Sequence, residues 1–150
     1  MKQFFAFVVI LLAMLLMVDA VPQQLYRRKA PSFAQCKGNF PNKISVKVSP
    51  VPLAFGKTET VTVSGVAKEL IPDGTFLRLG ISNADGDAIF DGAADFCAIP
   101  EIACPVEPGT KYKGSAKFEL PSNDVPGPSR LLVRIQIGDQ TLSCARGSVE

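Results

Sequence analysis

The sequence has no histidine and no tryptophan, and it has only four cysteines among its 150 residues. Without histidine there is no Ser-His-Asp triad and no Cys-His pair, so the commonest forms of nucleophilic catalysis are excluded. Two carboxylates could still act as acid and base. Nothing in the sequence selects such a pair from the fourteen acidic residues. We therefore expect a protein that is not an enzyme.

The sequence also has little that would hold a metal ion. Zinc knuckles pair their cysteine or histidine ligands at spacings of two to four residues, whereas the chain has no histidine and neither Cys97 with Cys104 nor Cys36 with Cys144 has that spacing. An acidic cluster begins at Asn83, but an EF-hand loop counted from there would need glycine and an acid where Ala88 and Ala94 stand. We expect no metal and no other cofactor.

Only one long hydrophobic run is present, from Phe4 to Val18 after Lys2. The run ends before small residues that a signal peptidase recognises, so we expect a signal peptide at residues 1–20 that is cleaved after Ala20. As a helix its fifteen residues would reach about 22 Å, against a hydrocarbon core of about 30 Å, which disfavours the alternative of a membrane anchor. The mature protein is then expected in the secretory pathway, either extracellular or in a vacuole or lysosome lumen, where disulfides persist.

Residues 21–32 form a polar segment that includes the basic triplet from Arg27 to Lys29. The segment is either a linker or a short pro-segment, and the triplet is either a processing site or part of a solvated arm. From Ala30 onward the chain has twelve basic and thirteen acidic residues, a net charge of −1. This balance gives no reason to expect a nucleic acid partner or strong attraction to anionic membranes.

Residues 33–150 are expected to form one all-β domain. Apolar and polar residues alternate in seven segments: Ile44 to Val48, Thr58 to Val66, Leu77 to Ile81, a short strand at Ile89 and Phe90, Tyr112 to Leu120, Leu131 to Ile137, and Thr141 to Arg146. Leu142 and Cys144 are expected to face inward, and Gly114 and Ala116 leave room on the dry face of their strand. No helical period follows the leader. The pattern predicts an immunoglobulin-like two-sheet β-sandwich of about seven strands.

The four cysteines allow three pairings, of which we favour Cys97 with Cys104 and Cys36 with Cys144. The first bridge would close a short apolar loop and the second nearly the whole domain, which corresponds to about 2.5 and about 4.8 kcal/mol of unfolded-state entropy. Free or metal-bound thiols are the alternative.

Apolar residues stand in segments that the alternation leaves as loops. Phe96, Ile99 and Ile102 lie in or beside the expected cystine loop; they either project toward a membrane at a cavity mouth or point inward and cap the core. The same choice applies to the phenylalanines of the domain, which either plug the ends of a filled core or line a cavity: Phe33, Phe40, Phe55, Phe76, Phe90, Phe96 and Phe118.

Several short motifs in order resemble the ML lipid-recognition domain. They are a secretory leader, Cys36 before the first strand, a strand ending in Val48-Ser49-Pro50-Val51-Pro52, Phe96-Cys97 followed by Cys104-Pro105, Leu120-Pro121, Val125-Pro126-Gly127 and the late Cys144. Within that family the sequence is similar to the fungal phosphatidylglycerol/phosphatidylinositol transfer proteins, and more distantly to the Niemann-Pick sterol carrier and the ganglioside activator. It departs from the sterol carriers in having four cysteines rather than six and no tryptophan.

The resemblance implies a sandwich whose sheets splay to hold lipid in an apolar cavity between them. On that basis we expect six residues to form the cavity wall: Leu77, Leu79, Phe118, Leu131, Val133 and Ile135. Four others are expected near the mouth: Phe90, Phe96, Val125 and Pro126.

The function that the resemblance implies is that of a secreted lipid-transfer protein. It would carry a phosphatidylglycerol- or phosphatidylinositol-like phospholipid between membranes as a monomer that contacts each membrane transiently. A sterol carrier of the same fold, and a non-lipid immunoglobulin-like module for protein interaction or the cell surface, are the alternatives.

Overall fold

The computed structural model describes residues 30–122 and 127–149, and these form eight β-strands and no helix. The strands are β1 (Phe33–Gln35), β2 (Lys43–Ser49), β3 (Thr58–Val66), β4 (Phe76–Ser82), β5 (Ala88–Asp95), β6 (Lys111–Glu119), β7 (Ser129–Ile137) and β8 (Gln140–Val149). The all-β prediction is confirmed. The strand that the sequence pattern missed is β1, whose three residues are too few to show alternation. The described part of the chain contains no helix that could span a membrane.

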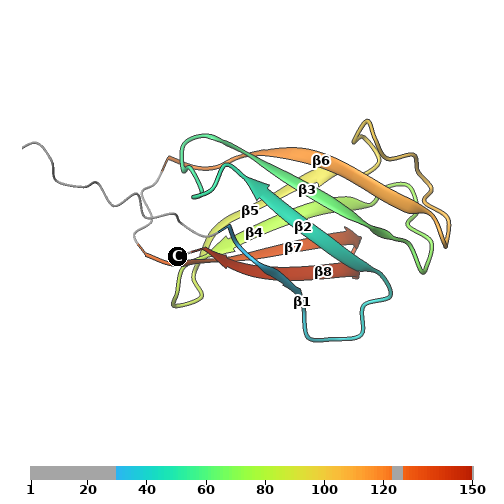
Figure 1. Ribbon diagram of the computed structural model, residues 1–150, viewed down its shortest axis with the longest axis horizontal. Coiled ribbons are helices and arrows are strands. Elements are labelled where there is room, and N and C mark those ends of the chain that lie inside the picture. Colours follow the sequence, from blue (N-terminus) through green and yellow to red (C-terminus); the bar gives the residue numbers. More distant parts are fainter. Residues whose placement is uncertain (1–29, 123–126, 150) are drawn as a thin grey trace, which may run out of the picture.

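The strands form two antiparallel sheets that pack face to face (Figure 1). One sheet has five strands in the order β1-β8-β7-β4-β5, and the other has three in the order β2-β3-β6. This is the predicted immunoglobulin-like sandwich.

Buried and exposed side chains alternate along the strands, and the buried ones form a core between the two sheets. In β3, Val61 and Val63 are completely buried, while their neighbour Thr62 is partly exposed and shares a hydrogen bond of 2.8 Å with Ser115 on the outer face. In β7, Val133 and Ile135 are likewise completely buried. Because side chains alternate between faces with a period of two, each strand contributes one apolar row to a common core.

The alternation breaks in β8, and the break corrects the expected orientation of Cys144. The register with β7 shifts near Ile135, where β8 has an extra residue. Beyond this bulge Cys144 lies opposite Arg134 and Ala145 lies opposite Val133. Directly opposed residues share a face, so Cys144 is on the outer face with Arg134, and its disulfide to Cys36 covers that position. A bulge shifts the period by one residue, which the sequence pattern alone does not reveal.

The two long edges of the sandwich are closed in different ways. At the edge formed by β1 and β2, the Gln35 side chain joins the sheets, since it accepts a hydrogen bond from the Ile44 N–H at 3.3 Å and donates one to the Ile44 carbonyl. At the opposite edge β5 belongs to one sheet and β6 to the other, and no strand pairing between described residues joins them. Among the described strands, hydrogen bonds between the two sheets are therefore found at the β1–β2 edge, while the connections that cross between the sheets meet at the Ile71–Val106 bridge.

Candidate functional site

The interior between the sheets brings together the six residues predicted to form a cavity wall. They are Leu77, Leu79, Leu131, Val133 and Ile135 of the five-stranded sheet and Phe118 of β6, and none is more than 4% exposed. Their side chains belong to one continuous apolar cluster. The geometry thus provides an interior lined by aliphatic and aromatic carbon.

The β5–β6 edge of this interior is closed by two aromatic rings. Phe90 of β5 meets Phe118 of β6 edge to face, with ring centroids 6.4 Å apart and an interplanar angle of 85°. Gly92 makes room for this contact, because a Cβ there would lie 2.4 Å from Cζ of Phe90. The ring of Phe90 therefore lies along its own strand in the space that Gly92 leaves, and Phe90 remains partly exposed.

The three other residues predicted near the cavity mouth, Phe96, Val125 and Pro126, are not seen at the β5–β6 edge. Phe96 is completely buried at the end of β5, where its ring packs against Tyr112 with centroids 5.6 Å apart. It therefore has the environment of a core residue. Val125 and Pro126 lie outside the described residues. Phe90 is the described member of the set that lies at an edge of the interior.

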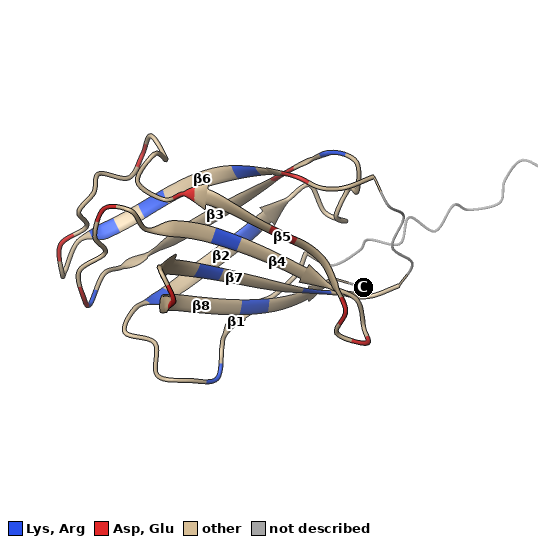
Figure 2. Ribbon diagram, turned by 180° about the vertical axis from the view of Figure 1, so that it is seen from behind, with Lys and Arg blue, Asp and Glu red and all other residues tan. Residues whose placement is uncertain are grey.

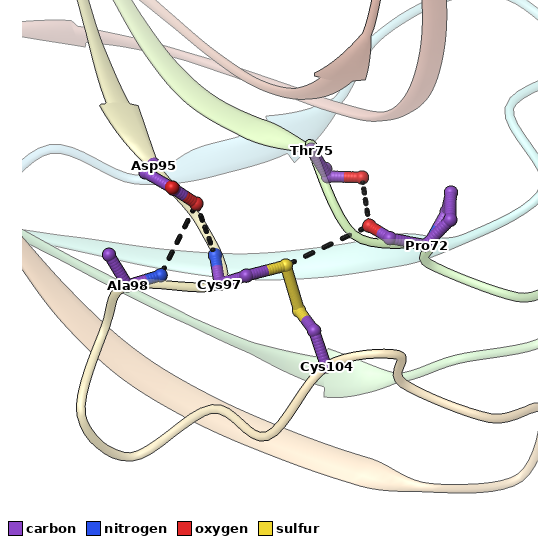
Figure 3. The surroundings of a disulfide bond; sticks show 6 residues. All are labelled: Pro72, Thr75, Asp95, Cys97, Ala98 and Cys104. Carbon is purple, nitrogen blue, oxygen red and sulfur yellow. Dashed lines mark hydrogen bonds between the residues drawn. A yellow bond between two sulfur atoms is a disulfide. The ribbon is translucent and has the colours of Figure 1, made fainter.

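The cystine loop after β5 is tied down by its own polar groups (Figure 3). Both predicted disulfides are present, Cys97–Cys104 and Cys36–Cys144. Asp95 Oδ1 accepts hydrogen bonds from the N–H groups of Cys97, at 2.9 Å, and Ala98, at 3.2 Å. A carboxylate that accepts two backbone N–H groups fixes the start of the loop in one conformation.

The apolar residues of this loop point inward. Ile99 and Ile102 are 4% and 5% exposed. A Cβ at Gly114 would lie 2.5 Å from Ile99 Cγ2 and 2.9 Å from Ile102 Cδ1, so these two side chains occupy the space that glycine leaves on the dry face of β6. Of the two alternatives for this loop, the structure supports the core cap rather than a membrane-docking surface.

Buried polar groups in the interior were not predicted from the sequence. Glu59 of β3 is completely buried, and its Oε1 accepts a hydrogen bond of 2.7 Å from the Ala54 N–H. Burial raises the pKa of Glu59 above its ordinary value, and the Ala54 hydrogen bond opposes that rise. Position alone could have revealed this residue, because Glu59 falls on the same face as Val61 in the alternation of β3.

A second buried polar pair lies where the two sheets face each other. The Tyr112 hydroxyl and Ser143 Oγ are both buried; they lie close together, but neither makes a hydrogen bond of good geometry with a described residue. Burial raises the pKa of Tyr112 to about 12, with the neighbouring Ser143 opposing the shift. Each group could donate or accept one hydrogen bond from a polar atom that enters the interior.

The acidic residues of the β4–β5 region have structural partners. Asn83 and Asp87 hydrogen-bond each other through side chain and backbone at the hairpin tip, at 2.9 and 2.8 Å, and Asp91 forms an ion pair of 2.9 Å with Arg78. Among the described residues, one group could bring three metal ligands together, Asp73 with Cys97 and Cys104. Those sulfurs form a disulfide, and a disulfide offers no thiolate to a metal.

Comparison with known proteins agrees with this architecture. Residues 30–150 match the family described as the ML domain. A Niemann-Pick type C2 protein from the Japanese carpenter ant superimposes with a TM-score of 0.59 at 11% identity, over 77% of this chain and 96% of that one. Chicken MD-1, solved in complex with lipid IVa, superimposes with a TM-score of 0.50 at 13% identity, over 79% and 86%. A comparison with curated protein sequences gave no significant match. The chain belongs to the ML domain family.

Proposed function

We propose that this protein binds a lipid between its two sheets and carries it through water without catalysing a reaction. The observation that carries the proposal is the difference between the two edges of the sandwich. Gln35 links the sheets by hydrogen bonds at one edge, whereas two phenylalanine rings close the other. Separating two rings breaks no hydrogen bond, so the β5–β6 edge is the place where the sheets can part at least cost.

The interior suits an apolar ligand. A sixteen-carbon acyl chain taken out of water is worth roughly 13 kcal/mol, at about 0.8 kcal/mol for each buried methylene group. A carrier must supply a comparable apolar surface, and the wall residues supply it from both sheets. In this structure their side chains contact one another, so we expect the sheets to move apart at the β5–β6 edge as the chain enters. The chicken MD-1 structure, which contains lipid IVa, supports a lipid as the ligand class.

We propose a phosphatidylglycerol- or phosphatidylinositol-like phospholipid as the ligand. It would be carried by a secreted monomer that contacts each membrane transiently, with Phe90 at the entrance. A sterol is the second candidate, because the buried hydroxyls of Tyr112 and Ser143 could pair with the single hydroxyl group of an otherwise apolar ligand.

Two neighbouring alanines of β5 provide a matched test. Ala94 faces the interior, packed against the core, and Ala93 faces outward and is exposed. The change Ala94→Phe should add a ring between the sheets at the β5–β6 edge and slow the transfer of labelled phospholipid between vesicles about tenfold or more, while Ala93→Phe should leave the rate unchanged. Native mass spectrometry after mild extraction should find a lipid bound to the wild type.

Two results would overturn the proposal. One is a wild-type protein that contains no lipid and moves none between vesicles. The other is a folded Ala94→Phe variant that transfers lipid as fast as Ala93→Phe. The mass of a co-purified lipid distinguishes phospholipid from sterol.

A further inference from the structure

All arginines of the domain lie on one surface. The structure describes four of them: Arg78 in β4, Arg130 and Arg134 in β7, and Arg146 in β8. The strand registers place all four on the outer face of the five-stranded sheet, and Figure 2 shows basic segments on β4, β7 and β8 in the sheet turned toward the viewer. The eight lysines of the domain lie in β2, β6 and the loops. Since residues 30–150 carry a net charge of −1, this concentration does not follow from overall basicity.

Three of these arginines surround one apolar residue. Arg130 and Arg134 stand two positions before and after Leu132, and Arg146 is directly opposite Leu132 on β8. Same-face neighbours along a strand, and diagonal neighbours across a pair, have Cα atoms roughly 7 Å apart. An arginine side chain is long enough to reach across that spacing, so the guanidinium groups can converge over Leu132.

The surface is hollowed at this place. A cavity of about 590 Å³ is lined by the three arginines together with Leu132, Gly80 and Phe90, among others. Gly80 lies opposite Leu132 on β4, and its missing side chain gives the hollow part of its depth. Small-molecule sites typically have volumes between about 300 and 1,000 Å³ and a mainly apolar lining with a few polar groups. This hollow has that size and that combination.

The three arginine charges in the hollow have no described counter-ion. Asp91 also lines the hollow, and its carboxylate forms an ion pair of 2.9 Å with Arg78. Within residues 30–122 and 127–149, no carboxylate lies within 4 Å of a guanidinium nitrogen of Arg130, Arg134 or Arg146. The Nε of Arg134 is buried and has no hydrogen-bond partner in the same residues. Neighbouring like charges repel, and an anion between them would relieve that repulsion.

We propose that this outer hollow binds an organic phosphate. The planar guanidinium fork matches two oxygens of a phosphate, and three forks around one point suit a doubly charged group. The floor formed by Leu132 and Gly80 would take an apolar portion next to the phosphate. The three arginines, Leu132 and Gly80 face away from the second sheet, so the phosphate would bind outside the interior, which the hollow adjoins at Phe90.

Phenyl phosphate and inorganic phosphate are suitable probes, since both are water-soluble and neither has an acyl chain. Binding is measured by isothermal titration calorimetry and located by shifts of backbone amide resonances. Phenyl phosphate should bind more tightly than inorganic phosphate and should shift the amides of Gly80, Leu132 and Arg146. Shifts confined to other parts of the molecule would overturn the proposal.

Two exposed pairs with equal charge provide matched variants. Arg130→Gln with Arg146→Gln removes two charges at the hollow, and Lys43→Gln with Lys47→Gln removes two from β2 on the other sheet. The double arginine variant should weaken phenyl phosphate binding about tenfold or more, and the double lysine variant should weaken it less than about twofold. Equal weakening by both pairs would mean attraction to general charge and would overturn the site.

A third variant tests the shape of the hollow without changing its charge. A Cβ at Gly80 would meet only Leu132, at 3.7 Å or more, so a side chain fits there without straining the sheet. Gly80→Leu should fill the floor of the hollow. It should weaken the binding of phenyl phosphate about tenfold and leave the binding of inorganic phosphate unchanged. Equal binding of phenyl phosphate to Gly80→Leu and to wild type would contradict an apolar subsite.

Vesicles identify the source of the phosphate. If the arginine pair also abolishes binding to phosphatidylcholine vesicles that contain phosphatidic acid, the natural ligand is a lipid head group at a membrane surface. If the wild type binds phenyl phosphate but not these vesicles, the natural ligand is a free phosphate ester. The interior variant Ala94→Phe should leave phenyl phosphate binding intact, so this proposal and that of lipid transport can fail separately.

Discussion

Glu59 places a carboxyl group at a position where the alternation of β3 would otherwise require an apolar side chain. It lies opposite Phe118, has no exposed surface, and has one carboxyl oxygen without a hydrogen-bond partner among the described residues. An ionised carboxylate in such a place is destabilising, because the apolar surroundings do not replace its hydration. The group is therefore held more readily in its protonated form, as the rise in its pKa indicates.

This rise makes the stability of the protein depend on pH. The unfolded chain has the ordinary pKa of 4.5 and the folded chain a higher one, so between these values the folded state binds more protons. The contribution of Glu59 to stability is therefore largest below about pH 4.5 and is lost as pH rises through the raised pKa. Glu59→Gln should make the protein more stable than wild type near pH 7, and the difference should shrink toward pH 4.

Urea unfolding of both proteins at several pH values measures this effect. Glu119→Gln is the control, because Glu119 is an exposed residue of β6 and should change stability by less than about 0.5 kcal/mol at any pH. A Glu59→Gln variant that is less stable than wild type at neutral pH would show that the carboxylate is ionised and satisfied in the folded state.

At the scale of elements, the cystine loop acts as part of the core. Its disulfide and the Asp95 hydrogen bonds hold the loop, and its two isoleucines fill the space over Gly114. The double change Ile99→Ser and Ile102→Ser should therefore reduce the free energy of unfolding by roughly 2 kcal/mol or more, because it removes buried methyl groups and buries hydroxyls.

Leu70 is a suitable control for that experiment, since it is an apolar residue of a nearby loop and is 44% exposed. Leu70→Ser should change stability by less than about 0.5 kcal/mol. Denaturant unfolding of the three proteins decides between the alternatives. A double serine variant as stable as wild type would mean that the isoleucines are free to contact a membrane.

Most strands could be predicted because each carries its own alternation. Where alternation is interrupted or too short, prediction failed: β1 has three residues, and the bulge in β8 moved Cys144 to the outer face. The inward position of the six predicted wall residues followed from the alternation of three strands, β4, β6 and β7. The buried position of Phe96 could not be predicted, because the sequence does not show that the chain turns back over β6 after β5 and packs Phe96 against Tyr112.

The arginine hollow could not have been predicted from the sequence, because its members come from separate strands. Gly80 belongs to β4, Arg130 and Arg134 to β7 and Arg146 to β8, and each arginine looks like an ordinary polar residue of an exposed strand face. Their proximity depends on the order β8-β7-β4 and on the register between these strands. Net charge also concealed them, since the whole domain is nearly neutral.

At the scale of the whole molecule, the two disulfides constrain very different lengths of chain. Cys36–Cys144 joins the end of β1 to β8 across a separation of 108 residues, while Cys97–Cys104 spans seven. In the chain-entropy account, a longer closed loop removes more freedom from the unfolded state. The first bridge also secures the short edge strand β1, which carries Gln35 and its hydrogen bonds to β2.

We therefore expect the two bridges to differ in their contribution to stability. Replacing Cys36 and Cys144 by serine should lower the free energy of unfolding by about 4.8 kcal/mol, and replacing Cys97 and Cys104 by about 2.5 kcal/mol. Each variant is compared with wild type by denaturant unfolding under non-reducing conditions. If the loop bridge proves the more important one, packing of the loop over Gly114 outweighs loop length. The serine variant of Cys36 and Cys144 should in addition lose the Gln35 contacts. Hydrogen-exchange protection of the Ile44 amide should therefore fall in this variant and persist in the serine variant of Cys97 and Cys104.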